Sequence, residues 1–177
     1  DKDEQLAVLD AVLEQAPAGR VIMGLAGNNL KSLLSLQTEI LKRPVAALLV
    51  PAPYYIRPSQ AALESFFRSV ADASSVPLIV YDIPYRTGVR IERETLRRIV
   101  RHPRIAAVKD CGGDSETTMA LIEDGHAQVL AGDVARLRRS QEEDGVGAGD
   151  GFRAGADDRA GRAVCSAGLC PGTRDLD

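Results

Sequence analysis

The amino-acid sequence predicts an α/β fold whose strands form a parallel sheet. Short apolar segments alternate five times with segments of helical periodicity between residues 4 and 131, which is the pattern of consecutive βα units. The apolar segments are almost free of polar interruptions, as expected for strands buried on both faces. A polar motif directly follows three of these strands, at the edge where α/β folds place their functional residues.

The first half of the chain gives three helices and two strands. Leucines at helical spacing mark the helices, and turn or cap residues mark where they begin and end. Pro17 and Gly19 end the first helix, Asn28 or Asn29 caps the second, and Ser59 caps the third. We expect a helix over residues 4–15, a strand over 20–24, a helix over 30–42, a strand over 46–50 and a helix from the Ser59 cap to residue 73.

The second half continues the alternation to residue 131. Its most informative strand is Ile105-Ala-Ala-Val-Lys109, which Gly112 and Gly113 break before Asp114 or Ser115 caps a helix. We expect a strand over residues 77–81, a loop over 82–88, a helix over 92–101, a strand over 105–109, a helix over 117–123 and a strand over 128–131.

Two architectures fit five βα units of this kind. One is a doubly wound sheet of flavodoxin type, and the other is part of an eight-stranded barrel, which typically needs about 250 residues. Residues 1–133 are expected to form this domain. Residues 134–177 carry only scattered apolar positions among Gly, Arg, Asp and Ala, so we expect a disordered tail or the product of a shifted reading frame.

Composition excludes several classes of function. The net charge of −3 implies no broad basic surface for nucleic acid, and no apolar run approaches the roughly 18 residues of a membrane span. The charged first residues resemble no signal peptide, so a cytoplasmic location is expected. Three cysteines without CxxC spacing, and two histidines beside turn residues (His102 and His126), predict neither a disulfide framework nor a metal site.

The candidate catalytic residue is Lys109, at the carboxyl end of a buried strand. A lysine in that position is partly withdrawn from water, which favours the neutral amine that attacks a carbonyl carbon. The alternative is that Lys109 extends from the strand end into solvent. Taken alone, the strand favours this alternative, and the neighbouring motifs change the balance.

Three motifs stand at consecutive strand ends. They are Pro53-Tyr54-Tyr55-x-x-Pro58-Ser59-Gln60, Tyr81-Asp82-Ile83-Pro84-Tyr85-Arg86-Thr87-Gly88, and Val108-Lys109-Asp110. In this order and spacing they closely resemble the dihydrodipicolinate synthase / N-acetylneuraminate lyase family of class I aldolases, and most of all its dihydrodipicolinate synthase branch. The resemblance covers roughly residues 3–133 and implies part of a (β/α)8 TIM barrel, about five βα units long.

The resemblance implies a role for each motif. Lys109 would form a Schiff base with the keto carbon of pyruvate, so that no dissociable cofactor is needed. Tyr81 would carry the proton: beside a lysine cation it can donate and, with a lowered pKa, also accept. Tyr55 would pass protons to solvent across a dimer interface, in a homo-oligomer (dimer or tetramer). Arg86, with Thr87 and Gly88, would bind the second substrate, expected to be aspartate semialdehyde on the route to lysine and diaminopimelate.

The chain also departs from the family pattern. The Gly-Thr-Thr-Gly-Glu loop and the Gly-Ile/Val-Ile-Ser segment of the family are not found in it, and Ser32 stands where the lysine-feedback site has an acidic residue. We therefore expect a barrel fragment that is inactive and poorly folded alone. The alternatives are a related keto-acid aldolase (N-acetylneuraminate lyase-like or 4-hydroxy-2-oxoglutarate aldolase-like), a non-catalytic remnant, and a doubly wound binding domain.

Overall fold

A computed structural model gives the structure of the chain and describes residues 1–17, 19–112 and 114–132. Five strands alternate with helices in that part, as the sequence predicts. The tail expected over residues 134–177 lies outside the described residues, as does Asp133 at the expected domain boundary. The strands are β1 (Ile22–Gly24), β2 (Ala47–Pro51), β3 (Leu78–Asp82), β4 (Ile105–Asp110) and β5 (Gln128–Ala131).

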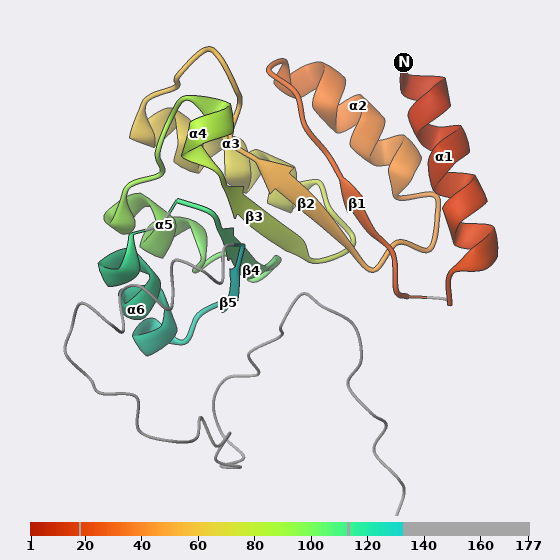
Figure 1. Cartoon of the computed structure of the whole chain (residues 1–177). Coiled ribbons are helices and arrows are strands. Elements are labelled where there is room, and N and C mark those ends of the chain that lie inside the picture. The colour runs from red at the N-terminus through yellow and green to blue at the C-terminus, as the bar shows by residue number, and fades with distance from the viewer. Residues whose placement is uncertain (18, 113, 133–177) are drawn as a thin grey trace, which may run out of the picture.

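The five strands form one parallel sheet in the order β1-β2-β3-β4-β5. Each strand therefore pairs with the next one along the chain, as Figure 1 shows from β1 (orange) to β5 (blue-green). A doubly wound sheet reverses its strand order at a switch point, whereas a barrel does not. The doubly wound alternative is therefore wrong, and the structure is a partial (β/α)8 barrel.

The helices begin at the residues whose side chains can cap them. Asn29, Ser59 and Asp114 each accept a hydrogen bond from a backbone N–H in the first turn of the following helix, which satisfies a donor that the helix leaves unpaired. The helices are α1 (Lys2–Gln15), α2 (Leu30–Ile40), α3 (Gln60–Asp72), α4 (Pro84–Thr87), α5 (Arg93–Ile99) and α6 (Ser115–Asp124).

The two faces of the sheet are covered differently. The main core joins side chains of α1, α2, α3, α5 and α6 to strand residues such as Leu48, Val80 and Val108. A second, small cluster contains strand residues alone: Ala47, Ile79 and Ala107, with Leu49 and Leu130 against them. The helices thus pack on one face, and the other face is the one that lines the interior of a barrel.

A bulge in β4 decides which of its residues face the helices. Leu78 pairs with Ile105 whereas the next residue, Ile79, pairs with Ala107, so Ala106 has no partner on β3. Ile105 and Val108 both belong to the main core although they are three positions apart, which strict alternation along a regular strand does not allow. Ala106 is exposed, contrary to the uninterrupted burial expected from the sequence.

The expected loop over residues 82–88 contains the one-turn helix α4, which sequence reasoning missed. Pro84 occupies its first turn, and Gly88 ends it with φ +76°, a left-handed conformation that favours glycine. His102 differs from the exposed loop residue expected, because its Nε2 lies 3.0 Å from a carboxylate oxygen of Asp72 and its side chain is largely covered.

Large apolar side chains are exposed near both ends of the sheet. Val8 and Val12 on α1 and Ile22 on β1 lie at one end, and Met119 and Ile122 on α6 lie at the other. These surfaces agree with the open sheet edges expected of part of a barrel. Among the described residues, no helix has the length and apolar character needed to cross a membrane.

Replacement of Phe67 by alanine should destabilise the fold strongly. Phe67 on α3 is completely buried and packs edge-to-face on Phe66, with ring centroids 5.3 Å apart. Phe→Ala in a core costs about 3–5 kcal/mol, whereas Val8→Ala on the exposed surface of α1 should cost less than about 0.5 kcal/mol. Thermal unfolding of both variants checks this, and equal losses would contradict the assigned core.

Candidate active site

The structure brings Tyr81 and Lys109 together at the carboxyl ends of β3 and β4. The two residues are direct partners in the parallel register, and the Lys109 Nζ lies 4.5 Å from the centroid of the Tyr81 ring. Each follows by two positions a residue of the small strand-only cluster, Ile79 and Ala107, and side chains two apart point to the same face. The pair therefore faces the barrel interior.

The phenol of Tyr81 stays protonated at neutral pH. Burial raises its pKa, the neighbouring Cys111 thiol adds to this by charge and by hydrogen bonding, and the Arg86 charge opposes it only in part. This differs from the lowered pKa expected beside a lysine. The Lys109 Nζ lies over the ring face, where a cation is attracted to the π-system, and Lys109 is not one of the largest influences on the Tyr81 pKa. Tyr81 is thus suited to donate a proton.

The short helix α4 carries Arg86 beyond Tyr81. The Arg86 guanidinium lies 5.6 Å from the centroid of the Tyr85 ring, and its charge reaches Tyr81, whose pKa it lowers. Arg86 and Tyr85 are both exposed. The structure therefore places an accessible arginine, with five hydrogen-bond donors in a fork, on the loop that follows the partly buried phenol of Tyr81.

Thr87 and Gly88 stabilise the backbone of this loop. Thr87 is buried, and its hydroxyl lies 3.2 Å from the Ile83 carbonyl oxygen and 2.9 Å from that of Val89. A Cβ added to Gly88 would lie 3.4 Å from the Arg57 Nε. Both residues thus hold the backbone that presents Arg86, and their contact with a substrate stays a prediction.

Tyr55 lies on the loop after β2 and is not packed against its own domain. Its side chain is 88% exposed, while its backbone N–H donates to the Thr87 carbonyl oxygen over 3.1 Å. Its φ of +71° is unusual for a residue with a side chain. The structure therefore ties the Tyr55 backbone to the Arg86 loop and leaves the phenol in solvent, so its proton-carrying role stays a prediction.

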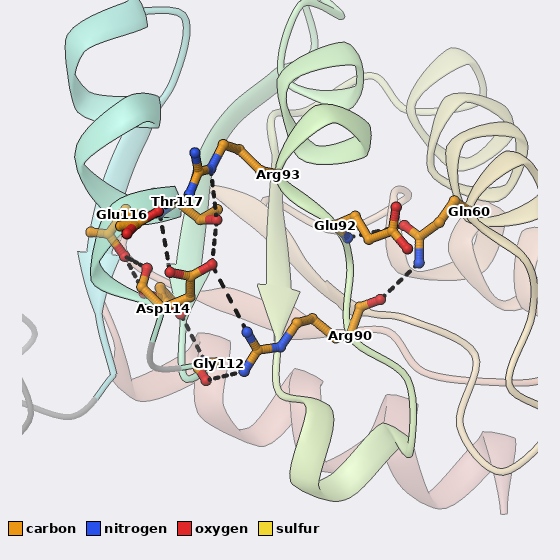
Figure 2. Close-up of polar contacts among 10 residues, drawn as sticks. Gln60, Arg90, Glu92, Arg93, Gly112, Asp114, Glu116 and Thr117 are labelled. Atoms are coloured by element: carbon orange, nitrogen blue, oxygen red, sulfur yellow. Dashed lines mark hydrogen bonds and ion pairs between the residues drawn. The ribbon is translucent and has the colours of Figure 1, made fainter.

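Gln60 and Arg90 fasten together the three loops that carry the candidate residues. Gln60 donates to the Arg90 carbonyl oxygen over 2.9 Å and accepts from the Glu92 N–H over 3.0 Å. The Arg90 side chain donates to the Gly112 carbonyl oxygen over 3.3 Å and lies 3.9 Å from an Asp114 carboxylate oxygen. Figure 2 shows this chain of contacts crossing from α3 to the start of α6.

A cleft of about 380 Å³ lies beside these contacts, next to the N-terminal ends of α5 and α6. Its lining includes Arg90 and Asp114, together with two carboxyl groups from the strand ends, Asp82 and Asp110. Asp82 directly follows Tyr81 and Asp110 directly follows Lys109, so both aspartate side chains point to the face of the sheet opposite to the tyrosine and the lysine. The cleft is therefore on the helix side and does not contain the lysine amine.

Asp82 and Asp110 form a carboxyl pair at the ends of β3 and β4, where they are register partners. Asp82 is only 6% exposed, and its Oδ1 has no hydrogen-bond partner in the part of the chain that the structure describes. Burial, and then the charge of Asp110, raise the pKa of Asp82 to about 7, against a smaller lowering by the Ile91 backbone N–H and by Arg90. Asp82 thus titrates near neutral pH.

Sequence reasoning missed these supporting residues. Gln60 and Asp82 stand inside the quoted motifs but received no role, and Arg90 stands outside them. One signal was present: an aspartate directly follows both Tyr81 and Lys109, and parallel pairing puts the two at the same height. No group of three or more His, Cys, Asp or Glu side chains that could hold a metal ion occurs in the described ranges.

Comparison with known proteins relates this site to one family. The model of the "Dihydrodipicolinate synthetase family" matches residues 1–140. The chain is 42% identical over 135 residues to a 4-hydroxy-tetrahydrodipicolinate synthase of Acidothermus cellulolyticus, covering 75% of this chain and 43% of that protein. It is 43% identical over 122 residues to synthase 1 of Streptomyces coelicolor, covering 68% and 40% respectively. The chain thus spans less than half the length of these relatives.

Solved structures give the same relationship. A dihydrodipicolinate synthase of Acinetobacter baumannii, determined in complex with pyruvate, superposes with a TM-score of 0.69 at 29% identity. The match covers 75% of this chain and 47% of that one. The strand order and the comparison therefore agree on a partial TIM barrel.

The stability of the chain should fall as the pH rises from about 4 to about 7. Asp82 has a pKa of about 7 in the folded state against 3.8 as the ordinary value, so the native state binds more protons than the unfolded state in this interval. The loss is up to about 4 kcal/mol and persists at higher pH. Asp82→Asn should remove it and make the chain more stable at pH 8 than the unchanged chain.

Thermal unfolding between pH 5 and pH 8 measures this, with Asp114→Asn as the matched control. Asp114 has a lowered pKa because it accepts from Thr117, and asparagine caps a helix as well as aspartate does. The control should therefore keep the slope of the unchanged chain in this interval. An Asp82→Asn variant that also keeps that slope would contradict the assignment.

Proposed function

The chain belongs to the dihydrodipicolinate synthetase family, and we propose that it carries the pyruvate-binding lysine centre of a synthase of the class I aldolase type. The observation that supports this most directly is the Lys109 amine, 4.5 Å from the centroid of the partly buried Tyr81 ring at the interior-facing strand ends. Proteins 42% and 43% identical to the chain are named 4-hydroxy-tetrahydrodipicolinate synthase. The proposed reaction joins pyruvate to an aldehyde.

The first half of the reaction needs only Lys109 and a proton donor. Lys109 first loses its ammonium proton to solvent, and the neutral amine then attacks the keto carbon of pyruvate. The C–N bond forms, and a proton passes from the nitrogen to the carbonyl oxygen, which gives a carbinolamine. Loss of that oxygen as water then leaves the imine on Lys109. Because the raised pKa of Tyr81 keeps its phenol protonated, Tyr81 is suited to supply the proton to the departing oxygen. No dissociable cofactor enters this scheme.

The second half needs a group that recognises the aldehyde. The Tyr81 phenolate left by the first half takes a methyl proton from the imine, which gives an enamine. The enamine carbon then attacks the aldehyde carbon, and Tyr81 returns the proton to the aldehyde oxygen. Arg86 is exposed on the same loop as Tyr81 and presents a fork suited to a carboxylate. Aspartate semialdehyde, which carries both an aldehyde and a carboxylate, is therefore the second substrate that we propose.

A second copy of the chain completes the proposed site. Tyr54, Tyr55, Ile56 and Tyr85 are all exposed on the loops after β2 and β3, and exposed aromatic side chains favour protein–protein contact. We infer that Tyr55 serves the site of another copy, since its side chain is 88% exposed on its own domain.

Lys109→Ala should abolish the covalent capture of pyruvate. The experiment treats the 177-residue chain with pyruvate and borohydride, which reduces an imine to a stable adduct, and locates the added mass by peptide mapping. Lys31→Ala is the control, since Lys31 is an exposed residue in the first turn of α2. An adduct on any residue other than Lys109 would contradict the proposal.

Arg86→Ala should impair the aldehyde step more than imine formation. Arg86 lies beyond Tyr81 on the α4 loop, so the lysine amine does not depend on it. Removal of a charge-assisted contact to a carboxylate costs about 1.5–3 kcal/mol, which corresponds to roughly a 10–150-fold weaker use of aspartate semialdehyde. The measurements are borohydride capture with pyruvate alone and consumption of the imine after the aldehyde is added. Loss of capture with pyruvate alone would contradict this division of roles.

A further inference from the structure

The carboxyl groups of Asp82 and Asp110 converge on one glycine behind the candidate active site. A Cβ added to Gly112 would lie 2.8 Å from the Asp82 Oδ2 and 3.3 Å from the Asp110 Oδ1. The Gly112 N–H donates to the same Asp110 Oδ1 over 2.7 Å. Both carboxyl groups therefore contact Gly112, where a side chain would not fit. This contact holds the two acids near each other at the covered ends of β3 and β4.

The hydrogen bonds around Asp110 require a count of protons. The Thr118 Oγ1 lies 2.5 Å from the Asp110 Oδ2 and 3.0 Å from the Asp114 carbonyl oxygen. A threonine hydroxyl has one proton, and a carbonyl oxygen has none to give. The Thr118 hydroxyl donates along the shorter contact to the Asp110 Oδ2, and the Gly112 N–H donates to the Asp110 Oδ1. Asp110 thus accepts at both oxygens, and the one proton that the pair shares rests on Asp82, the acid whose pKa is raised.

We propose that Asp82 and Asp110 share one proton and act as positioning residues, which hold the ends of β3 and β4 at the register that sets the Lys109 amine over the Tyr81 ring. This role rests on the proposed imine chemistry of Lys109. The two acids do not touch a substrate in this scheme, because they point to the helix side of the sheet. They act through the strand ends, where Asp82 follows Tyr81 directly and Asp110 follows Lys109 directly.

The charges around the pair decide how it responds to pH. Asp110 on β4 and Asp114 at the start of α6 oppose ionisation of Asp82, and Arg90 before α5 favours it. From α5, Arg93 and Glu94 line the same cleft, as does Glu92 at its cap, and Arg93 is paired to Glu116 over 2.7 Å. Arg90 is the cation among the largest influences on the Asp82 pKa, and it is shared with Asp114 and the Gly112 carbonyl oxygen (Figure 2).

Loss of the shared proton should therefore push the two strand ends apart. Two carboxylates on register partners repel each other, and a buried site screens that repulsion poorly. Tyr81 and Lys109 would move with the strands that carry them. Misplacement of a reacting group by about 1 Å can cost on the order of 10²-fold in rate, so a smaller displacement should cost roughly tenfold.

The test compares the rate of pyruvate capture by borohydride in the 177-residue chain and in three variants, from pH 5.5 to pH 8.5. Asp82→Asn and Asp110→Asn each leave one acid and remove the repulsion. Asp114→Asn is the matched control, since it removes a neighbouring carboxylate and keeps the helix cap. Each rate is expressed relative to the unchanged chain at the same pH, which cancels the ionisation of the lysine and of the reagents.

The expected ratio for Asp82→Asn is near one at pH 5.5, where the pair of the unchanged chain already holds its proton. It should rise roughly tenfold by pH 8.5, and Asp110→Asn should show the same rise. The Asp114→Asn ratio should stay flat. Infrared spectra should also show a protonated-carboxyl band at neutral pH in the unchanged chain and in Asp114→Asn, and lose it in Asp82→Asn.

Flat ratios for both Asp82→Asn and Asp110→Asn, with capture intact, would overturn the positioning role and leave the function of Lys109 standing. If Asp82→Asn does not fold, Asp110→Asn decides by the same ratio. Absence of capture in every chain, when thermal unfolding shows that the unchanged chain is cooperatively folded, would overturn the imine chemistry itself, and the positioning role with it. Absence of the carboxyl band in the unchanged chain would overturn the shared proton whatever the capture experiment gives.

Discussion

The pairing of β3 with β4 is the constraint on which the rest of the site depends. In the observed register Tyr81 lies opposite Lys109 and Asp82 opposite Asp110. A shift by one residue would place an aspartate beside the tyrosine and would turn one member of each pair to the other face. The bulge at Ala106 produces this register, because it lets Ile105 and Val108 both join the main core while Lys109 faces the barrel interior.

Backbone contacts beyond the last paired residues maintain the register. The Cys111 N–H donates to the Asp82 carbonyl oxygen over 2.8 Å, and the Gly132 N–H donates to the Asp110 carbonyl oxygen over 2.8 Å. These bonds extend the ladder past the strand ends and join three strands at the height of the site. The Gln60 and Arg90 contacts then connect the loops above them, so Lys109 and the loop of Arg86 belong to one hydrogen-bonded unit.

Features that depend on one segment of the chain could be predicted from the sequence. Features that depend on contacts between neighbouring segments could not. Alternating apolar segments predicted all five strands, and Ser59 and Asp114 were predicted as helix caps because each acts within one turn of its own helix. The bulge, the helix α4 and the Asp82–Asp110 pair depend on how neighbouring segments meet, which no single segment encodes. The same holds for Tyr81, whose pKa depends on burial and on Cys111 more than on the adjacent lysine.

The carboxyl pair is difficult to explain as a structural device. Asparagine at position 82 would fill nearly the same volume and would not carry the charge that burial penalises. Hydrogen bonding offsets this penalty only in part, since the Ile91 backbone N–H bonds to Asp82 but the Asp82 Oδ1 has no partner among the described residues. A buried acid with a strongly raised pKa, placed one residue from the candidate proton donor, is the arrangement typical of functional sites. The instability that the pair brings is therefore best understood as the consequence of holding Tyr81 and Lys109 in a geometry that depends on a single proton.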